Sequence, residues 1–197
     1  MEFCDVFPHS TTKFVRWSGK GSYFALVFEN KIVVRETESS AIAYLSKGSN
    51  IAEIKKFEWS NDETKFAFYV PKNGLLKVVD LAESTTDNVI AKLENEMGIE
   101  SLLWSPDSQN LVLLDDCGIK TTIINLRNGQ LFHIKNPKGP TCMAFSPDSR
   151  FFAMIQRKNV GEECINIFET MNWRQVKVRI LKEKRSILIS NVFRHLE

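Results

Sequence analysis

The chain has 197 residues, of which 43% are hydrophobic and 25% charged, a composition typical of a folded globular protein. Its formal net charge of +2 excludes a strong overall field that would attract nucleic acid or an anionic membrane. No stretch approaches the ~18 apolar residues of a membrane-spanning helix, and the acidic N-terminus is unlike a signal peptide, so we expect a soluble cytoplasmic protein.

The first predicted structural unit covers residues 13–48 and follows a proposed closure strand at 1–12. It contains four short segments rich in Val, Ile and Phe, which read FVRWS, YFALVFE, KIVVRET and AIAYLS. Turn residues separate the segments. Four short strands of this kind, joined by turns, are what one blade of a β-propeller requires.

The same frame recurs three more times, at residues 49–97, 98–138 and 139–181. Each unit begins with a strand that ends in an aromatic residue, and the spacings between these residues are 42, 45 and 41. A period in the low forties with strand-like content indicates a propeller rather than an array of helical repeats. The aromatic residues, which we expect in the core, are Trp17, Trp59, Trp104 and Phe145.

A tight turn is predicted directly after each aromatic residue. Proline fixes φ at the first corner of such a turn, and aspartate can accept a hydrogen bond from its own downstream backbone. We therefore assign these residues a structural role in the first turn of each blade. They are Ser18 in the first unit, Ser60 and Asp62 in the second, Ser105, Pro106 and Asp107 in the third, and Ser146, Pro147 and Asp148 in the fourth.

The third segments favour the WD-repeat class of propeller. WD-repeat proteins end this strand in Trp-Asp, and here Asp80, Asn125 and Glu169 follow a bulky residue at that place. The predicted fold is therefore all-β, a WD-repeat-type β-propeller with about four four-stranded blades, part of a parent with about seven. Residues 182–197 form a basic, divergent tail where the next blade is expected, so we expect a truncated gene model, an alternative product or a fragment.

Several stretches, taken in order, resemble the centrosomal and spindle-pole WD-repeat proteins that anchor microtubule minus ends. They are MEFCDVF, KIVVRET, FEWSNDE, KNGLLKVVDL and the run from HIKNPKGPTCMAFSPDSRFFAMIQRK to CINIFETMNW. The resemblance covers residues 1–180, although every repeat lacks the Trp of Trp-Asp. It implies a non-catalytic scaffold at the centrosome or spindle pole that supports spindle, basal-body or cilium organisation. The implied partner is a coiled-coil anchoring protein, with indirect association with microtubules and no membrane, nucleic acid or cofactor.

Residues that could support catalysis or bind metal are scattered. No pair has the short spacing of a metal site, so we interpret the cysteines as reduced, mostly buried thiols and His133 as a surface residue. The Asp115-Asp116 pair is expected in a hairpin turn rather than a cation site. We therefore predict no catalytic, cofactor-binding or metal-binding residue. The residues considered are His9, His133, His195, Cys4, Cys117, Cys142 and Cys164.

Partner contacts are expected at loops, because rigid scaffolds usually carry function there. Two other functions remain open. A basic C-terminal region at 171–194 would suit an RNA- or ribosome-associated propeller of the translation-initiation type, and a downstream catalytic domain would make this the propeller of a prolyl-oligopeptidase-like hydrolase. The candidate contact residues are Lys72, Asn73, Asn136, Lys138, Arg157 and Lys158.

Overall fold

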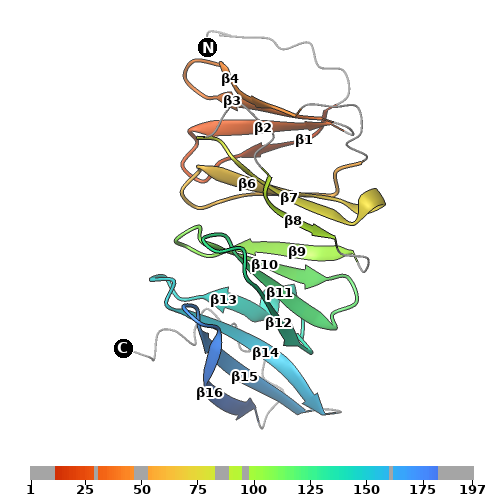
Figure 1. Ribbon diagram of the computed structural model, residues 1–197, viewed down its shortest axis with the longest axis vertical. Coiled ribbons are helices and arrows are strands. Elements are labelled where there is room, and N and C mark those ends of the chain that lie inside the picture. Colours follow the sequence, from red (N-terminus) through yellow and green to blue (C-terminus); the bar gives the residue numbers. More distant parts are fainter. Residues whose placement is uncertain are drawn as a thin grey trace.

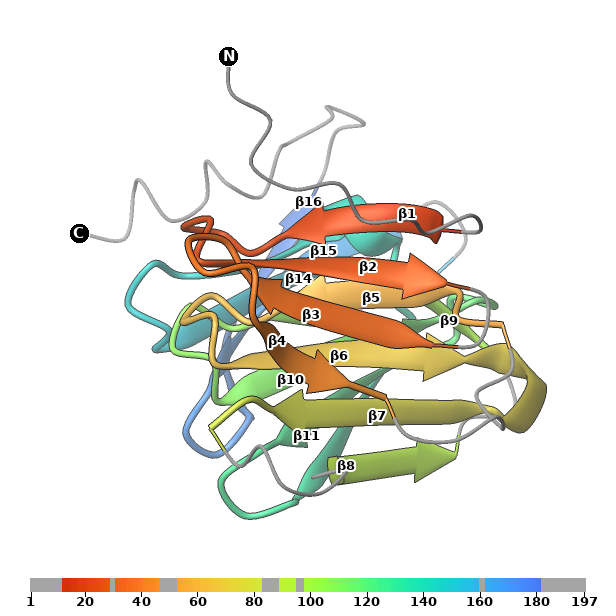
Figure 2. The ribbon, with the colours of Figure 1, turned by 90° about the horizontal axis from the view of Figure 1, so that it is seen from above.

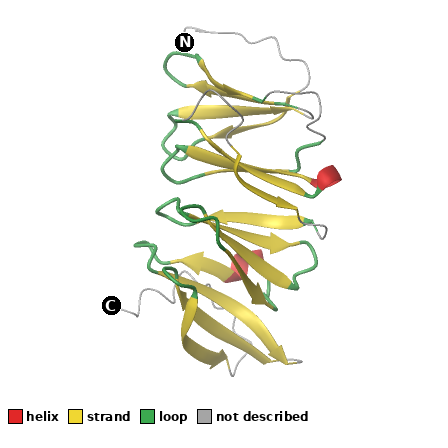
Figure 3. Ribbon diagram, viewed as in Figure 1, coloured by secondary structure: helices red, strands yellow, loops and turns green. Residues whose placement is uncertain are grey.

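A computed structural model describes residues 12–28, 31–46, 53–82, 89–94, 98–159 and 162–181. In these ranges the chain forms four four-stranded antiparallel sheets, stacked one after another along the molecule (Figure 1). Strands dominate the described part of the chain, where the helical structure consists of two short 3-10 turns (Figure 3). The predicted all-β fold of four propeller blades is confirmed. The proposed closure strand, apart from Thr12, and the basic tail lie outside the described residues.

Consecutive strands pair within each sheet, and we call the sheets blades 1 to 4. Blade 1 contains β1 (Thr12–Trp17), β2 (Tyr23–Phe28), β3 (Ile32–Glu36) and β4 (Ile42–Leu45). Blade 2 contains β5 (Lys56–Trp59), β6 (Lys65–Val70), η1 (Pro71–Asn73), β7 (Leu75–Asp80) and β8 (Val89–Glu94). Blade 3 contains β9 (Ile99–Trp104), β10 (Asn110–Asp115), β11 (Lys120–Asn125) and β12 (Leu131–Lys135). Blade 4 contains η2 (Pro140–Cys142), β13 (Met143–Phe145), β14 (Phe151–Asn159), β15 (Glu162–Glu169) and β16 (Arg174–Leu181).

The core consists of apolar layers between neighbouring blades. Because side chains of a strand alternate between its two faces, the second strand of a blade can contribute to two layers. In β10, Leu111 and Leu113 pack with blade 2, whereas Val112 and Leu114 pack with blade 4. This explains why the second strands are apolar almost throughout. Seen from above, each sheet is turned relative to its neighbour (Figure 2).

The predicted core position of the first aromatic residue is wrong. Trp104 is 5% exposed, and Trp59 and Phe145 are partly buried, but Trp17 is 59% exposed. The difference follows from position, since Trp59 packs in the layer between blades 1 and 2 and Trp104 in the layer between blades 2 and 3. Among the described residues, no blade precedes blade 1, so Trp17 has nothing to pack against on that side.

The expectation that the cysteines are mostly buried needs a similar correction. Cys164 is buried and Cys142 partly buried, but Cys117 is exposed because it lies in the turn between β10 and β11. Cys4 is outside the described residues. All three described cysteines are free thiols. Within the described ranges, no helix is long and apolar enough to cross a membrane.

Candidate functional site

The predicted blade turns are held by a repeated set of hydrogen bonds. In blades 2 to 4 the hydroxyl of the turn serine donates a hydrogen bond to Oδ1 of the aspartate two residues later. The same Oδ1 atom also accepts a hydrogen bond from the backbone N–H of the residue two positions after the aspartate. The hydroxyl bonds are Ser60–Asp62, Ser105–Asp107 and Ser146–Asp148, each 2.6 Å. The backbone donors are Thr64, Gln109 and Arg150, each at 3.1 Å.

In blades 2 to 4 the fourth residue of the turn links that turn to the preceding blade. The fourth residue has positive φ in all four blades, at Gly21 (84°), Glu63 (63°), Ser108 (56°) and Ser149 (60°), and three of these residues carry a side chain that accepts a hydrogen bond. The backbone N–H of Asp62 donates to Ser108 Oγ at 3.1 Å, and that of Asp107 donates to Ser149 Oγ at 2.8 Å. These bonds tie the turns of neighbouring blades together.

At the junction of blades 1 and 2 a carboxylate replaces this serine. The first turn has Lys20 where the other turns have aspartate, and the backbone N–H of Lys20 donates to Glu63. Glu63 is 4% exposed. Burial raises its pKa, but hydrogen bonds from Ser22, Ser18 and the backbone of Lys20 and Gly21 outweigh burial, so its pKa lies below the ordinary value. Glu63 therefore supplies from blade 2 the carboxylate that the blade 1 turn lacks.

Two turn aspartates have a lowered pKa for related reasons. The Ser146 hydroxyl and the backbone N–H of Arg150 lower the pKa of Asp148 by stabilising its charged form. Partial burial raises the pKa of Asp62, but hydrogen bonds from Ser60 and Thr64 overcome it. Ionised carboxylates are therefore part of the turn structure, and this arrangement supports stability rather than acid–base chemistry.

The tryptophans make a second repeated contact between blades. The indole N–H of Trp59 donates to the backbone oxygen of Arg16, and that of Trp104 to the oxygen of Glu58, both at 3.2 Å. In each case the acceptor immediately precedes the tryptophan of the neighbouring blade. Sequence reasoning missed this bond because nothing local indicates which carbonyl the indole reaches.

Blade 4 has Phe145 at this position, and a distant tryptophan adds aromatic volume to the same layer. Trp173 lies in the turn between β15 and β16 with a φ of 55°, and is 7% exposed. Its ring lies 5.6 Å from that of Phe152, 6.1 Å from Phe132 and 6.3 Å from Phe145. The layer between blades 3 and 4 is therefore packed from a turn as well as from the strands.

The candidate contact residues lie at the ends of the strands opposite the blade turns. Lys72 and Asn73 belong to η1, on the side of the molecule shown at the right of Figure 1. The other four come together where the segment between β12 and η2 meets the end of β14, and Arg157 and Lys158 lie in this strand rather than in a loop as expected. The backbone N–H of Arg157 donates to the oxygen of Asn136 at 2.9 Å, its guanidinium donates to the oxygen of Lys138 at 3.0 Å, and Lys158 is next in β14.

The residues considered for chemistry have structural partners. His133 is exposed, as predicted, and its Nδ1 lies 3.1 Å from Thr122 Oγ1. The carboxylate of Asp115 accepts N–H bonds from Ile119 at 2.9 Å and Lys120 at 3.1 Å, which closes the turn as expected. Within the described ranges, no group of three or more His, Cys, Asp or Glu residues could hold a metal ion.

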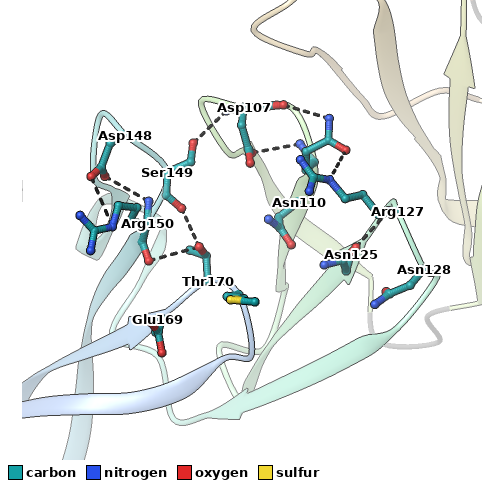
Figure 4. Close-up of a pocket in the computed structure, with 12 residues that line it drawn as sticks. Asp107, Asn110, Asn125, Arg127, Asn128, Asp148, Ser149, Arg150, Glu169 and Thr170 are labelled. Carbon is teal, nitrogen blue, oxygen red and sulfur yellow. Dashed lines mark hydrogen bonds and ion pairs between the residues drawn. The ribbon is translucent and has the colours of Figure 1, made fainter.

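A groove of about 450 Å³ lies between blades 3 and 4 on the side of the blade turns (Figure 4). Sequence reasoning did not predict it, because its residues come from two turns in each blade. The groove is polar and carries both signs of charge. It is lined by Asp107, Gln109, Asn110, Asn125, Arg127 and Asn128 of blade 3, and by Asp148, Ser149, Arg150, Glu169, Thr170 and Met171 of blade 4.

Comparison with known proteins identifies one protein of similar sequence. No protein-family model matches the chain. The WD repeat-containing protein WRAP73 of Mus musculus is 24% identical over 163 residues, which are 82% of this chain and 34% of that protein. The chain therefore spans about a third of the length of this relative.

Solved structures share the fold at low sequence identity. The β-propeller domain of Cps50 (Swd1) from Myceliophteria thermophila has a TM-score of 0.60 at 11% identity, covering 92% of this chain and 59% of that one. A chain of the mitotic checkpoint complex has a TM-score of 0.60 at 17% identity, covering 84% and 49%. Kuenenia stuttgartiensis hydrazine synthase has a TM-score of 0.57 at 14% identity, covering 88% of this chain and 51% of that one. Together with the four blades described above, these likenesses show that the chain has a WD-repeat-type β-propeller fold and forms an open part of such a propeller.

Proposed function

We propose that this protein is a non-catalytic scaffold that binds protein partners at the centrosome or spindle pole. The observation that carries the proposal is the sequence likeness to a WD repeat-containing protein along 82% of the chain. The order of the family-like stretches over residues 1–180 supports the centrosomal part. A stack of blades whose candidate contact residues lie at one end of the strands suits such a role.

The proposed partner is a coiled-coil anchoring protein, through which the scaffold associates with microtubules indirectly. The proposed contact surface is the basic end, which we define as Lys72, Asn73, Asn136, Lys138, Arg157 and Lys158. The four cationic side chains are exposed, although Lys138 Nζ lies 2.7 Å from Glu163 Oε2. Coiled coils commonly carry charged residues along their flanks, so an acidic flank would complement this end.

The proposal is tested by locating the protein in dividing cells. The endogenous gene is tagged and the product is imaged beside a spindle-pole marker, with the tag alone as control. A focal signal at the poles through mitosis is the expected result. A diffuse signal in cells where the marker remains focal would refute the centrosomal role and leave the fold unaffected.

A further inference from the structure

We propose that the groove between blades 3 and 4 binds an extended peptide segment of a partner protein, with Asn110 pairing with the main chain of the peptide. The inference rests on the proposed function only in that the ligand is a protein. It concerns the blade-turn side of the molecule, whereas the basic end lies on the other side. Partners could therefore bind both ends of the strands at once.

Asn110 carries a polar group that the fold leaves unused. Its backbone is fully paired with Ser105, donating to Oγ and accepting from N, both at 2.9 Å. Its side chain is only 5% exposed, and its Oδ1 is closed to solvent without a hydrogen-bond partner in the described part of the chain. A buried carbonyl oxygen without a hydrogen-bond partner is unfavourable and rare in native proteins. The amide faces the space between the two blades, on the side of Thr170 (Figure 4).

The repeat shows that the fold does not require an amide here. The first residue of the second strand is Tyr23 in blade 1, Lys65 in blade 2 and Phe151 in blade 4. Each donates its backbone N–H to the turn serine, as Asn110 does. The backbone role is therefore common to all blades, and the carboxamide belongs to blade 3 alone.

The charges of the groove favour a peptide main chain over a phosphate-bearing ligand. Arg127 is held by Gln109, with Nε donating to Oε1 at 3.0 Å. The Arg150 Nε atom lies 4.0 Å from the Asp148 carboxylate. The wall carries two cations and three carboxylates, so a polyanion would meet net repulsion. These charged residues are Arg127, Arg150, Asp107, Asp148 and Glu169.

The rim of the groove adds an apolar contact for a peptide side chain. Met171 is 88% exposed, in the turn between β15 and β16. The neighbouring Thr170 is fixed, because its hydroxyl donates to the backbone oxygen of Ser149 at 2.6 Å. Methionine adapts to varied apolar shapes and is common at surfaces that accept different partners. The groove therefore offers main-chain pairing at its floor and an adaptable apolar contact at its edge.

One residue of an extended peptide can pair with both ends of the Asn110 amide, because its own N–H and C=O point to the same side of the strand. Nδ2–H donates to the peptide carbonyl, and Oδ1 accepts from a peptide N–H after rotation about χ2. Two hydrogen bonds of ordinary net strength correspond to about a tenfold change in Kd. Removal of the carboxamide should weaken peptide binding by at least this factor without weakening the fold.

The test uses the full 197-residue chain and a phage-displayed library of random 12-residue peptides. Enriched peptides are made with a fluorescent label, and their Kd is measured for the wild type, Asn110→Leu and Gln130→Leu. Gln130 is a matched control because it is an exposed carboxamide of blade 3 that does not line the groove. Thermal melting checks the fold of each variant, and Asn110→Ala replaces Asn110→Leu if that variant does not fold.

The expected result is a Kd that rises at least tenfold in Asn110→Leu and less than twofold in Gln130→Leu. N-methylation of one peptide amide should weaken binding similarly in the wild type and have little further effect in Asn110→Leu. Failure to enrich any peptide, or equal affinity for the wild type and Asn110→Leu, would overturn the proposal. Because purified components are used, either failure is independent of where the protein is located in cells.

Discussion

The Glu63 carboxylate of blade 2 accepts a hydrogen bond from the backbone N–H of Lys20 in blade 1. In the next two junctions a serine hydroxyl does the same. The blade 1 turn, however, has no aspartate of its own, and Glu63 also accepts from the hydroxyl of the turn serine Ser18, as the aspartates do in the other turns. A single buried side chain thus completes one turn and joins two blades.

Glu63→Gln should destabilise the protein by about 1–3 kcal/mol, because it removes the charge from a buried acceptor of several hydrogen bonds. Since the pKa of Glu63 is lowered in the folded state, its contribution is fully present above the ordinary pKa of 4.5. The contribution is lost as the pH falls through the lower folded value. Urea unfolding of the wild type and Glu63→Gln at pH 7 and below pH 4 measures the difference. A gap that widened on acidification would contradict the assignment.

Trp59→Phe and Trp104→Phe should each cost about 1 kcal/mol for the lost indole–carbonyl bond, in addition to the loss of buried ring area. The matched control is Trp17→Phe, because this side chain is mostly exposed and should change the free energy of unfolding by less than about 0.5 kcal/mol. Chemical unfolding followed by circular dichroism gives all three values. Equal costs at the three positions would rule out a role for the bonds between blades.

Ser149→Ala should expose one particular backbone amide to exchange. The N–H of Asp107 donates to Ser149 Oγ, whereas the N–H of Asp62 donates to Ser108 Oγ, and local loss of a hydrogen bond lowers local protection. Hydrogen exchange measured by NMR should become faster at Asp107 and stay unchanged at Asp62. In Ser108→Ala the reverse is expected, with faster hydrogen exchange at Asp62 and no change at Asp107. Faster exchange at both amides in both variants would contradict the separate links.

The open face of blade 1 should promote self-association at high concentration. Three apolar side chains of blade 1 are exposed, Val15 to 47%, Trp17 to 59% and Leu45 to 50%. Val15 and Leu45 lie on the same face of the sheet, because Val15 is paired with Leu26, Leu26 with Val33, and Val33 with Leu45. Apolar patches of this kind are sites of association. Trp17→Lys should lower the mass-average molecular weight in sedimentation equilibrium.

Met171→Lys is the control for this prediction, because Met171 is an exposed apolar residue at the other end of the stack. It should leave association through blade 1 unchanged. A wild type that stays monomeric at high concentration, or an equal effect of both substitutions, would show that the blade 1 face is not the site of contact.

The repeating part of this structure could be predicted from sequence, because period-two apolar segments and turn residues are local features. Aromatic residues spaced in the low forties indicated the four blades, and the turn serines and aspartates indicated where each blade begins.

The contacts between blades could not be predicted. Glu63 reaches a turn 43 residues away, and Trp173 fills a layer from a turn that has no local signal for it. The exposure of Trp17 depends on what lies beside blade 1, which the repeat pattern does not specify. Asn110 is inconspicuous in sequence, because only the structure shows that its Oδ1 is buried without a hydrogen-bond partner.

We propose that the protein is held at the spindle pole through its basic end. The most direct measurement compares the pole signal of Lys72→Glu/Lys158→Glu with that of Lys20→Glu/Arg174→Glu at matched expression. All four side chains are exposed, so both pairs change the charge equally, at opposite ends of the strands. The account predicts a diffuse signal for the first pair and a focal signal for the second. A focal signal for both, or loss of signal in both, would contradict it.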